Sequence, residues 1–130
     1  TRFMLTRESA IHPDIKQALL EASLLDTRLI KRTLRRTSRV LRNAVSDEVV
    51  TLERRPQGAS FEELESLLSG ARGHAALQSG KVHDGLICAS QVIGLIDDIP
   101  SCAEVVERLV RQCRERLNTT EVFMRSFPAS

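Results

Sequence analysis

The sequence of 130 residues contains no tryptophan and no tyrosine, and its four phenylalanines make up the whole aromatic content of 3%. Aromatic side chains form the stacking platforms of proteins that bind single-stranded nucleic acids, so such a platform is not expected here. The three cysteines, Cys88, Cys102 and Cys113, are an odd number and include no Cys-x-x-Cys pair. This pattern argues against a disulfide framework or a zinc module, and we expect a reducing, cytoplasmic location.

Long apolar runs are also missing. The longest uncharged stretch in an apolar region covers residues 85–96, which is shorter than the about 20 residues of a transmembrane helix. No apolar signal-peptide region follows the first residues. We therefore expect neither a membrane span nor a secretory signal. Because the chain opens on Thr1 rather than on methionine, we expect a segment of a longer polypeptide.

The sequence contains 42% hydrophobic and 28% charged residues and has a net charge of +2, a composition that is typical of a globular protein. Seven basic residues and no acidic one lie between Arg28 and Arg42. The favoured interpretation is a solvated face whose arginine stems cover apolar surface. Pairing with acidic residues elsewhere is the second interpretation. Nucleic-acid binding is the least favoured, because neither base-reading side chains nor a docking motif accompany the arginines.

Helical spacing of apolar residues predicts helices over 13–25 and 38–55, whereas 27–34 is compatible with a helix or a short strand. Pro13 suits the first position of its helix.

Two capping boxes predict further helix starts. Ser60 and Glu63 begin a helix over 61–68, and Ser101 and Glu104 begin one over 101–117. A short helix over 71–78 should close at Gly80. Beyond residue 117 we expect an irregular chain.

Residues 86–96 are apolar apart from Ser90 and Gln91, and periodicity does not distinguish a buried strand from a buried helix. Both polar side chains are therefore expected to be buried. A buried glutamine needs hydrogen-bond partners, which a core contact or a ligand in a pocket could supply. Ser90 and Gln91 are thus candidate pocket-lining residues, with a core hydrogen bond as the alternative.

No catalytic constellation and no metal site is predicted. His12, His74 and His83 are isolated, and none lies at metal-ligand spacing from another histidine or a cysteine. We interpret all three as structural residues, with His12 at the start of a helix.

Several short motifs occur in a characteristic order. Thr1-Arg2-Phe3, the run Thr-Arg-Glu-Ser over 6–9, and His12-Pro13 with Lys16 come first. Residues 39–43, 69–73 and 90–104 follow, the last containing Gly-Leu-Ile-Asp-Asp-Ile-Pro-Ser-Cys-Ala-Glu. Over residues 1–116 the sequence resembles the C-terminal third of nitronate monooxygenases. These were formerly called 2-nitropropane dioxygenases, and their family includes NAD(P)H:quinone reductases.

The resemblance implies a fold. The family's enzymes are FMN-dependent (β/α)8 TIM barrels that carry a smaller helix-rich domain. This chain is then mainly α, a C-terminal helical segment of such a flavoprotein with at most one or two short strands. Residues 1–26 would form the end of the barrel with its phosphate-end loop and helix, and 27–85 the small domain. Residues 86–117 would return to the barrel with its last outer helix, and 118–130 would form an irregular tail.

The resemblance also implies a function. Thr1 would belong to the turn that binds the FMN phosphate, and the parent protein would oxidise alkyl nitronates with oxygen or reduce quinones with NAD(P)H. The family's active-site histidine and most of its flavin-binding loops precede Thr1, so the chain alone is expected to be inactive. The partners would be FMN and a small-molecule substrate, with no nucleic acid and no membrane. The alternative is a small all-α binding module that uses the basic face from Arg28 to Arg42.

Overall fold

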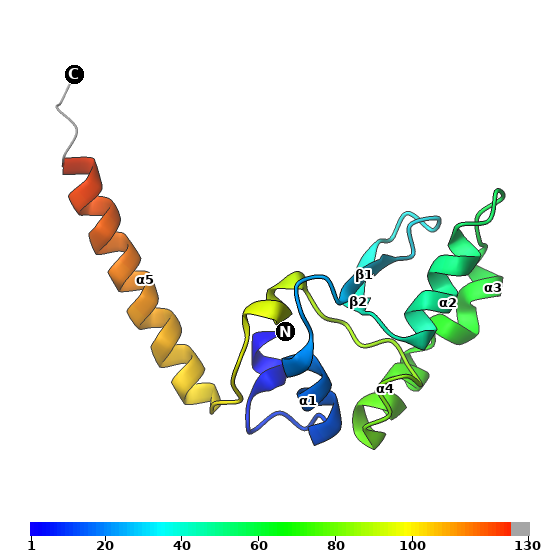
Figure 1. The fold of residues 1–130 in the computed structure, drawn as a ribbon, viewed down its shortest axis with the longest axis horizontal. Helices are drawn as coiled ribbons and strands as arrows, with labels where there is room; N and C mark the ends of the chain where they lie inside the picture. Colours follow the sequence, from blue (N-terminus) through cyan, green and yellow to red (C-terminus); the bar gives the residue numbers. More distant parts are fainter. Residues whose placement is uncertain (126–130) are drawn as a thin grey trace.

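The computed structural model describes residues 1–125 (Figure 1). Helices dominate, and one antiparallel pair of strands joins them, which confirms the mainly α class expected for this chain with its two short strands. The elements in chain order are η1 (Arg2–Leu5), α1 (Pro13–Glu21), β1 (Thr27–Ile30), β2 (Ser38–Leu41), α2 (Ala44–Glu53), α3 (Phe61–Leu68), α4 (Gly70–Ser79), η2 (Gln91–Leu95) and α5 (Cys102–Arg125), of which η1 and η2 are 3-10 helices.

Helix α1 begins at Pro13 as predicted, and the His12 ring accepts a hydrogen bond from the Asp14 N–H at 3.2 Å. The helix ends at Glu21, earlier than the predicted residue 25. The reason is a local turn, in which the carboxylate of Asp26 accepts from both the N–H and the hydroxyl of Ser23 at 2.8 and 2.7 Å. These bonds favour a turn over the continued helix.

Lys16 on α1 is buried, with 8% of its surface exposed. Its Nζ donates to the carbonyl oxygen of Thr6 at 2.6 Å. A buried ammonium group needs acceptors, and here a backbone carbonyl supplies one. The bond fastens the segment after η1 onto α1, which gives the lysine of the His-Pro-x-x-Lys motif a structural role.

The helix predicted over 38–55 is wrong in its first part, because residues 38–41 form β2. Strand β2 pairs with β1 in the register Thr27 to Leu41, so the strand alternative for the segment after residue 27 is confirmed. Asn43 lies two residues after the end of the strand and caps α2 by accepting from the Ser46 N–H at 2.9 Å. The apolar side chains of the strand and of the helix keep a common spacing, which made the two elements look like one helix.

Strand β2 separates two hydrophobic cores, because successive side chains of a strand point to opposite faces. Val40 packs with α2 and α3, while Leu41 packs with η1, α1 and η2. The first core contains Leu5, Ile15, Leu19, Leu41, Ile87, Ala89, Ile93 and Ile96. The second contains Ile30, Val40, Val45, Val49, Ala59, Leu64 and Leu67.

The apolar run over 86–96 is neither one strand nor one helix. Its first part is extended beside β2, where the Leu41 N–H donates to the Ile87 carbonyl at 2.8 Å, and its second part is η2. Ser90 and Gln91 are exposed, so their predicted burial is wrong. The tight winding of η2 turns Ile93 into the core and leaves Gln91 outside.

Close backbone approach fixes η2 against the end of α1. A Cβ atom on Gly94 would lie 2.3 Å from the backbone nitrogen of Leu24. Glycine is therefore the residue that allows this contact.

Helices α3 and α4 match their predictions. The capping box between Ser60 and Glu63 is present in both directions, at 3.4 and 2.9 Å. Gly80 ends α4 with a φ of 80°, the left-handed conformation that glycine adopts readily. The imidazole of His12 lies against Gly80, where a Cβ atom would approach its Nδ1 to 2.4 Å, so the structural interpretation of His12 is confirmed.

Helix α5 begins with the predicted capping box, in which Ser101 and Glu104 exchange hydrogen bonds. It continues to Arg125, so the irregular chain expected after residue 117 is wrong as far as residue 125, and the rest of that prediction lies outside the described residues. Thr119 and Thr120 fit the helix because their hydroxyls donate to carbonyl groups of the preceding turn.

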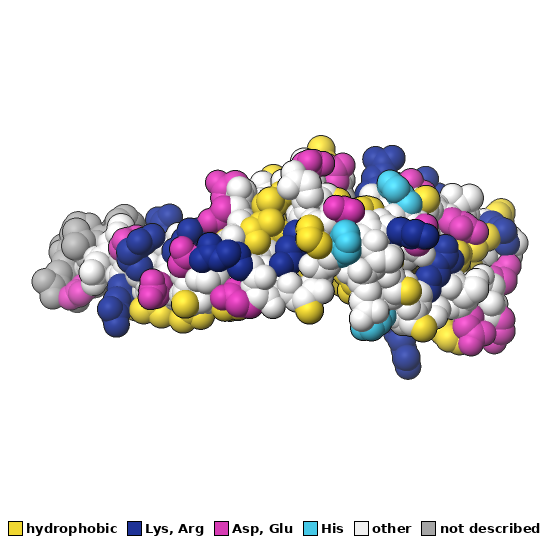
Figure 2. All heavy atoms as spheres, turned by 90° about the horizontal axis from the view of Figure 1, so that it is seen from below, with side chains coloured by type: hydrophobic (Ala, Val, Ile, Leu, Met, Phe, Trp, Pro, Cys, Tyr) yellow, Lys and Arg dark blue, Asp and Glu magenta, His cyan; other side chains and the backbone are white. Residues whose placement is uncertain are grey.

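Most of α5 extends away from the rest of the molecule (Figure 1). Val105 near its start is 2% exposed, whereas Leu109 and Leu117 are 52% and 64% exposed. Figure 2 shows hydrophobic side chains in a row along one edge of this arm. The apolar stripe is thus formed as predicted, but only its first turn is covered within this chain.

Candidate functional site

Two of the three predicted site residues meet at the amino-terminal end of the chain. The hydroxyl oxygen of Thr1 accepts the backbone N–H of Ser90 at 3.0 Å, and the two side-chain hydroxyls are also 3.0 Å apart. Gln91 follows as the first residue of η2, with its side chain exposed. The fold therefore places Thr1 beside the first residue of the 90–104 segment.

The groups at this junction are hydrogen-bond donors of the kind that bind phosphate. Thr1 precedes η1, and the first N–H groups of any helix have no acceptor within it. Hydroxyl and N–H groups at a helix start fit a phosphate oxygen. The guanidinium of Arg2 is already held by Asp98 at 2.7 Å. The Thr1 hydroxyl and the first N–H groups of η1 are thus donors of the kind that a phosphate group accepts.

A set of ion pairs fastens the start of α5 beside this junction. Asp98 bridges Arg2 and Arg108, and the carboxylate of Glu104 lies 2.8 Å from the guanidinium of Arg7. The carboxylate of Glu8 accepts the N–H of Cys102 at 3.0 Å, at the first residue of the helix.

These contacts lower the pKa values of three carboxyl groups. The hydrogen bond from Arg108, with the contact to Arg2, lowers the pKa of Asp98. Hydrogen bonds from the backbone and hydroxyl of Ser101 lower the pKa of Glu104. For Glu8 the pKa is lowered by its own backbone N–H and then by that of Cys102. All three groups are therefore favoured in the ionised state in the folded chain.

An apolar hollow of about 500 Å³ lies between residues 4–11, the β1–β2 hairpin, the end of α3 and helix α4. Met4, Ile11 and Leu77 contribute to its wall, and His74 and Cys88 add a ring and a thiol. Apolar walls with a few polar groups are typical of small-molecule sites. No local sequence pattern marks this hollow, because its lining comes from segments far apart in the chain.

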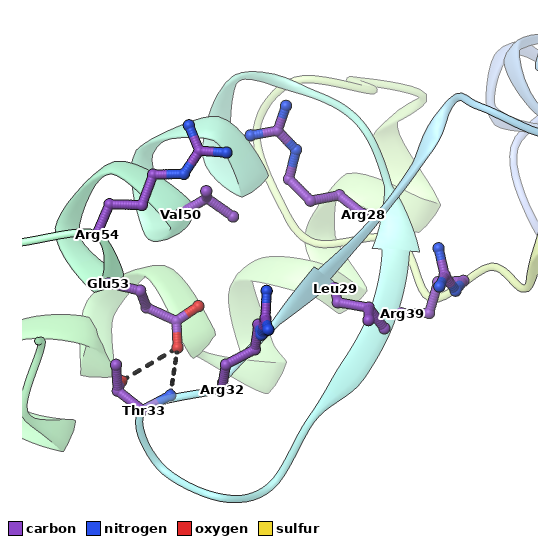
Figure 3. Close-up of a pocket in the computed structure, with 8 residues that line it drawn as sticks. All are labelled: Arg28, Leu29, Arg32, Thr33, Arg39, Val50, Glu53 and Arg54. Carbon is purple, nitrogen blue, oxygen red and sulfur yellow. Dashed lines mark hydrogen bonds between the residues drawn. The ribbon is translucent and has the colours of Figure 1, made fainter.

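The predicted basic face does not lie on a helix. Its residues lie on β1, on β2 and in the loop between them, except for Arg42, which follows β2. The all-α module is therefore wrong as a description of this surface. Asp47 on α2 lies 2.6 Å from Arg28 and 3.8 Å from Arg42, which supports pairing for these two residues. Arg28, Arg32 and Arg39 of the set also line a pocket against α2 (Figure 3).

Residues 1–125 contain no cluster of three or more His, Cys, Asp or Glu side chains that could hold a metal ion. None of the helices within this part of the chain is long and apolar enough to cross a bilayer.

The model of the nitronate monooxygenase family matches residues 1–112. The chain belongs to this family. The resemblance carried by the motifs from Thr1 to Lys16 and over 90–104 is thereby confirmed.

Solved structures and a curated relative extend this result. FabK from Thermotoga maritima is 25% identical, with a TM-score of 0.81 over 94% of this chain and 38% of FabK. The M276A mutant of the same FabK gives 24% identity and a TM-score of 0.73, covering 94% of this chain and 35% of the mutant. A (3aS,4S,5R,7aS)-5-hydroxy-7a-methyl-1-oxo-octahydro-1H-indene-4-carboxyl-CoA dehydrogenase of Rhodococcus jostii (strain RHA1) is 24% identical over 152 residues, which cover 91% of this chain. The chain spans 43% of that relative's length.

Proposed function

We propose that this chain is the C-terminal part of an FMN-dependent oxidoreductase built on a (β/α)8 barrel. The observation that carries the proposal is the family match over residues 1–112. In this proposal residues 1–26 complete the phosphate end of the barrel, 27–85 form the small domain, and 86–117 return to the barrel. The protein acts in the cytoplasm.

Thr1 and Ser90 are the residues of this chain that we propose lie nearest the flavin phosphate. Their mutual hydrogen bonds would hold the Thr1 hydroxyl and the start of η1 in a fixed orientation. When bound, FMN would supply the redox chemistry, while the protein supplies binding and orientation. Gln91 would line the substrate pocket, since its exposed side chain follows directly on this junction.

The exposed apolar stripe of α5 supports the proposal that further elements pack on this helix. Leu109, Val110 and Leu117 are 52%, 45% and 64% exposed, on a helix whose first turn is already docked. An apolar stripe of this kind is expected to be buried against other elements of the same fold. We propose that barrel elements preceding Thr1 in the longer protein cover it.

For the reaction, we propose oxidation of alkyl nitronates with oxygen or reduction of quinones with NAD(P)H. A second candidate is oxidation of a coenzyme A thioester, which the name of the Rhodococcus relative suggests. The arginine-lined pocket beside α2 favours this candidate, because coenzyme A carries several phosphate groups.

Steady-state assays of the complete flavoprotein test these reactions. Oxygen uptake with an alkyl nitronate, quinone reduction by NADH or NADPH, and electron-acceptor reduction by an acyl-CoA are measured in parallel. Turnover in at least one assay is the expected result. A purified complete protein that carries no flavin and turns over none of these substrates contradicts the proposal.

A further inference from the structure

A pocket of about 440 Å³ lies between the β1–β2 hairpin and α2 (Figure 3). Four arginines line it from different elements: Arg28 on β1, Arg32 in the loop, Arg39 on β2 and Arg54 at the end of α2. Figure 3 shows their side chains placed around the hollow rather than in one row. Its volume falls within the range of about 300–1,000 Å³ that small-molecule sites occupy.

The positive charge of this pocket is only partly compensated. Arg28 lies 2.6 Å from Asp47, and Arg39 donates to the neutral hydroxyl of Thr27 at 2.9 Å. Within residues 1–125 the side chains of Arg32 and Arg54 make no ion pair and no hydrogen bond.

The one carboxylate in the lining, that of Glu53, is hydrogen-bonded to Thr33, another residue of the pocket wall. Glu53 accepts from the N–H and the hydroxyl of Thr33 at 3.0 and 3.1 Å, as Figure 3 shows. Four guanidinium groups against the carboxylates of Glu53 and Asp47 leave the pocket with a net charge of +2.

The hydrogen-bond donors of this lining match the oxygen atoms of a phosphate ester. A guanidinium group offers a planar fork of donors that matches two phosphate oxygens, and it also stacks on planar rings. Leu29 and Val50 add a small apolar wall between the arginines, suited to a ribose or a base. Arginines on several sides fit a ligand whose phosphate groups are separated, rather than a single anion.

We infer that this pocket binds the phosphate groups of an adenosine nucleotide that carries a phosphate ester on its ribose. The binding rests on the pocket itself, whereas the choice of an adenosine nucleotide rests on the proposed function. Such a nucleotide has two sources with the same chemistry. NADPH carries the ester at the 2′ position, and coenzyme A carries it at the 3′ position.

A long nucleic acid fits this site less well. Duplex binding requires positive charge spread along the backbone of the ligand, and single strands are held by stacking on aromatic side chains. The positive charge here surrounds a hollow, and its lining contains no aromatic residue.

Isothermal titration calorimetry of the 130-residue chain with adenosine 2′,5′-bisphosphate and adenosine 3′,5′-bisphosphate tests the inference. The Arg32→Gln/Arg54→Gln double variant removes the two unpaired guanidinium groups from the pocket. Loss of one charge-assisted contact corresponds to about a tenfold weaker binding or more. We expect at least this loss. Because both side chains are exposed and unpaired, the far-UV circular dichroism should stay unchanged.

Arg36→Gln is the matched control, since Arg36 is an exposed arginine of the same loop that does not line the pocket. It should change the dissociation constant less than twofold. A preference for the 2′ ester indicates NADPH as the source, and a preference for the 3′ ester indicates coenzyme A.

Three results overturn the inference. They are the absence of binding by either bisphosphate at millimolar concentration, an equal loss in the control and the double variant, and tighter binding of a DNA duplex with steep salt dependence. Failure of the proposed function is seen separately, as absence of flavin and turnover in the complete protein. If the complete protein carries flavin and turns over a substrate but its pocket binds neither bisphosphate, only this inference is rejected.

Discussion

Replacing Asn43 should destabilise the chain more than replacing any exposed helix cap. Asn43 is 3% exposed and connects three segments. Its Oδ1 accepts the Ser46 N–H at 2.9 Å, and its Nδ2 donates to the carbonyl groups of Val82 and Gly85 at 2.7 and 2.8 Å. The residue thus caps α2 and also holds the turn before residue 86 against it.

The expected loss of stability follows from these three hydrogen bonds. Loss of a helix cap costs about 1 kcal/mol, and each of the two buried carbonyl groups loses a donor worth about 1 kcal/mol. Asn43→Ala should therefore lower the free energy of unfolding by about 3 kcal/mol. With a urea dependence of about 1–3 kcal/mol per molar, the midpoint should fall by about 1–3 M.

Urea unfolding of the chain, followed by far-UV circular dichroism, measures this effect. Asn43→Asp keeps the acceptor for the Ser46 N–H but turns an oxygen toward two carbonyl oxygens, so its loss should equal or exceed that of the alanine variant. Ser60→Ala is the control, because it removes one exposed cap worth about 1 kcal/mol. The predicted role of Asn43 is wrong if the Asn43→Asp chain is as stable as the unchanged chain, or if Asn43→Ala lowers the free energy of unfolding no more than Ser60→Ala does.

Three further predictions concern the junction and α5. Ser101→Ala in the complete protein should cost about 0.5–2 kcal/mol of stability, and an unchanged melting temperature counts against the cap. Gln91→Ala in the complete protein should alter KM or the flavin spectrum more than the melting temperature, because its side chain is exposed; early melting with unchanged kinetics contradicts this. Since the pKa values of Glu8, Asp98 and Glu104 are lower in the folded chain, their stabilisation is complete above about pH 4.5 and is lost as the pH falls through the folded values. The hydrogen-exchange protection factor at the start of α5, which is corrected for the intrinsic exchange rate at each pH, should therefore fall below about pH 4, and an unchanged or larger protection factor in acid contradicts it.

The sequence predicted those elements whose ends carry their own chemistry. The capping boxes at Ser60 and Ser101 and the glycine at position 80 mark helix ends through local hydrogen bonds and backbone conformation, which do not depend on the rest of the fold. Pro13 likewise marked the start of α1. The helix starts and the glycine stop were correct for this reason.

The hairpin could not be predicted in the same way. Val40 and Leu41 face two different cores, and their spacing to Val45 and Val49 imitates a helical stripe. Only the pairing with β1 and the cap at Asn43 separate the strand from the helix. Both depend on contacts that the local pattern does not contain.

The candidate site was predictable only through the family motifs. The hydrogen bonds between Thr1 and Ser90 join residues that lie 89 positions apart in the sequence. Ser90 and Gln91 were expected to be buried because their neighbours are apolar, but η2 turns them outward. The arginine pocket could not be predicted without the hairpin, since its lining residues come from two strands, the loop between them and the end of a helix.

Flavin retention shows whether this chain needs the rest of a barrel to bind FMN. The 130-residue chain and the complete protein are each dialysed against FMN, freed of unbound ligand, and compared by flavin absorbance per polypeptide. We expect stoichiometric flavin in the complete protein and none in the chain alone, because Thr1 and Ser90 would supply only one edge of the proposed phosphate site. A chain that retains stoichiometric FMN by itself would contradict the account and would require a self-sufficient flavin site within these 130 residues.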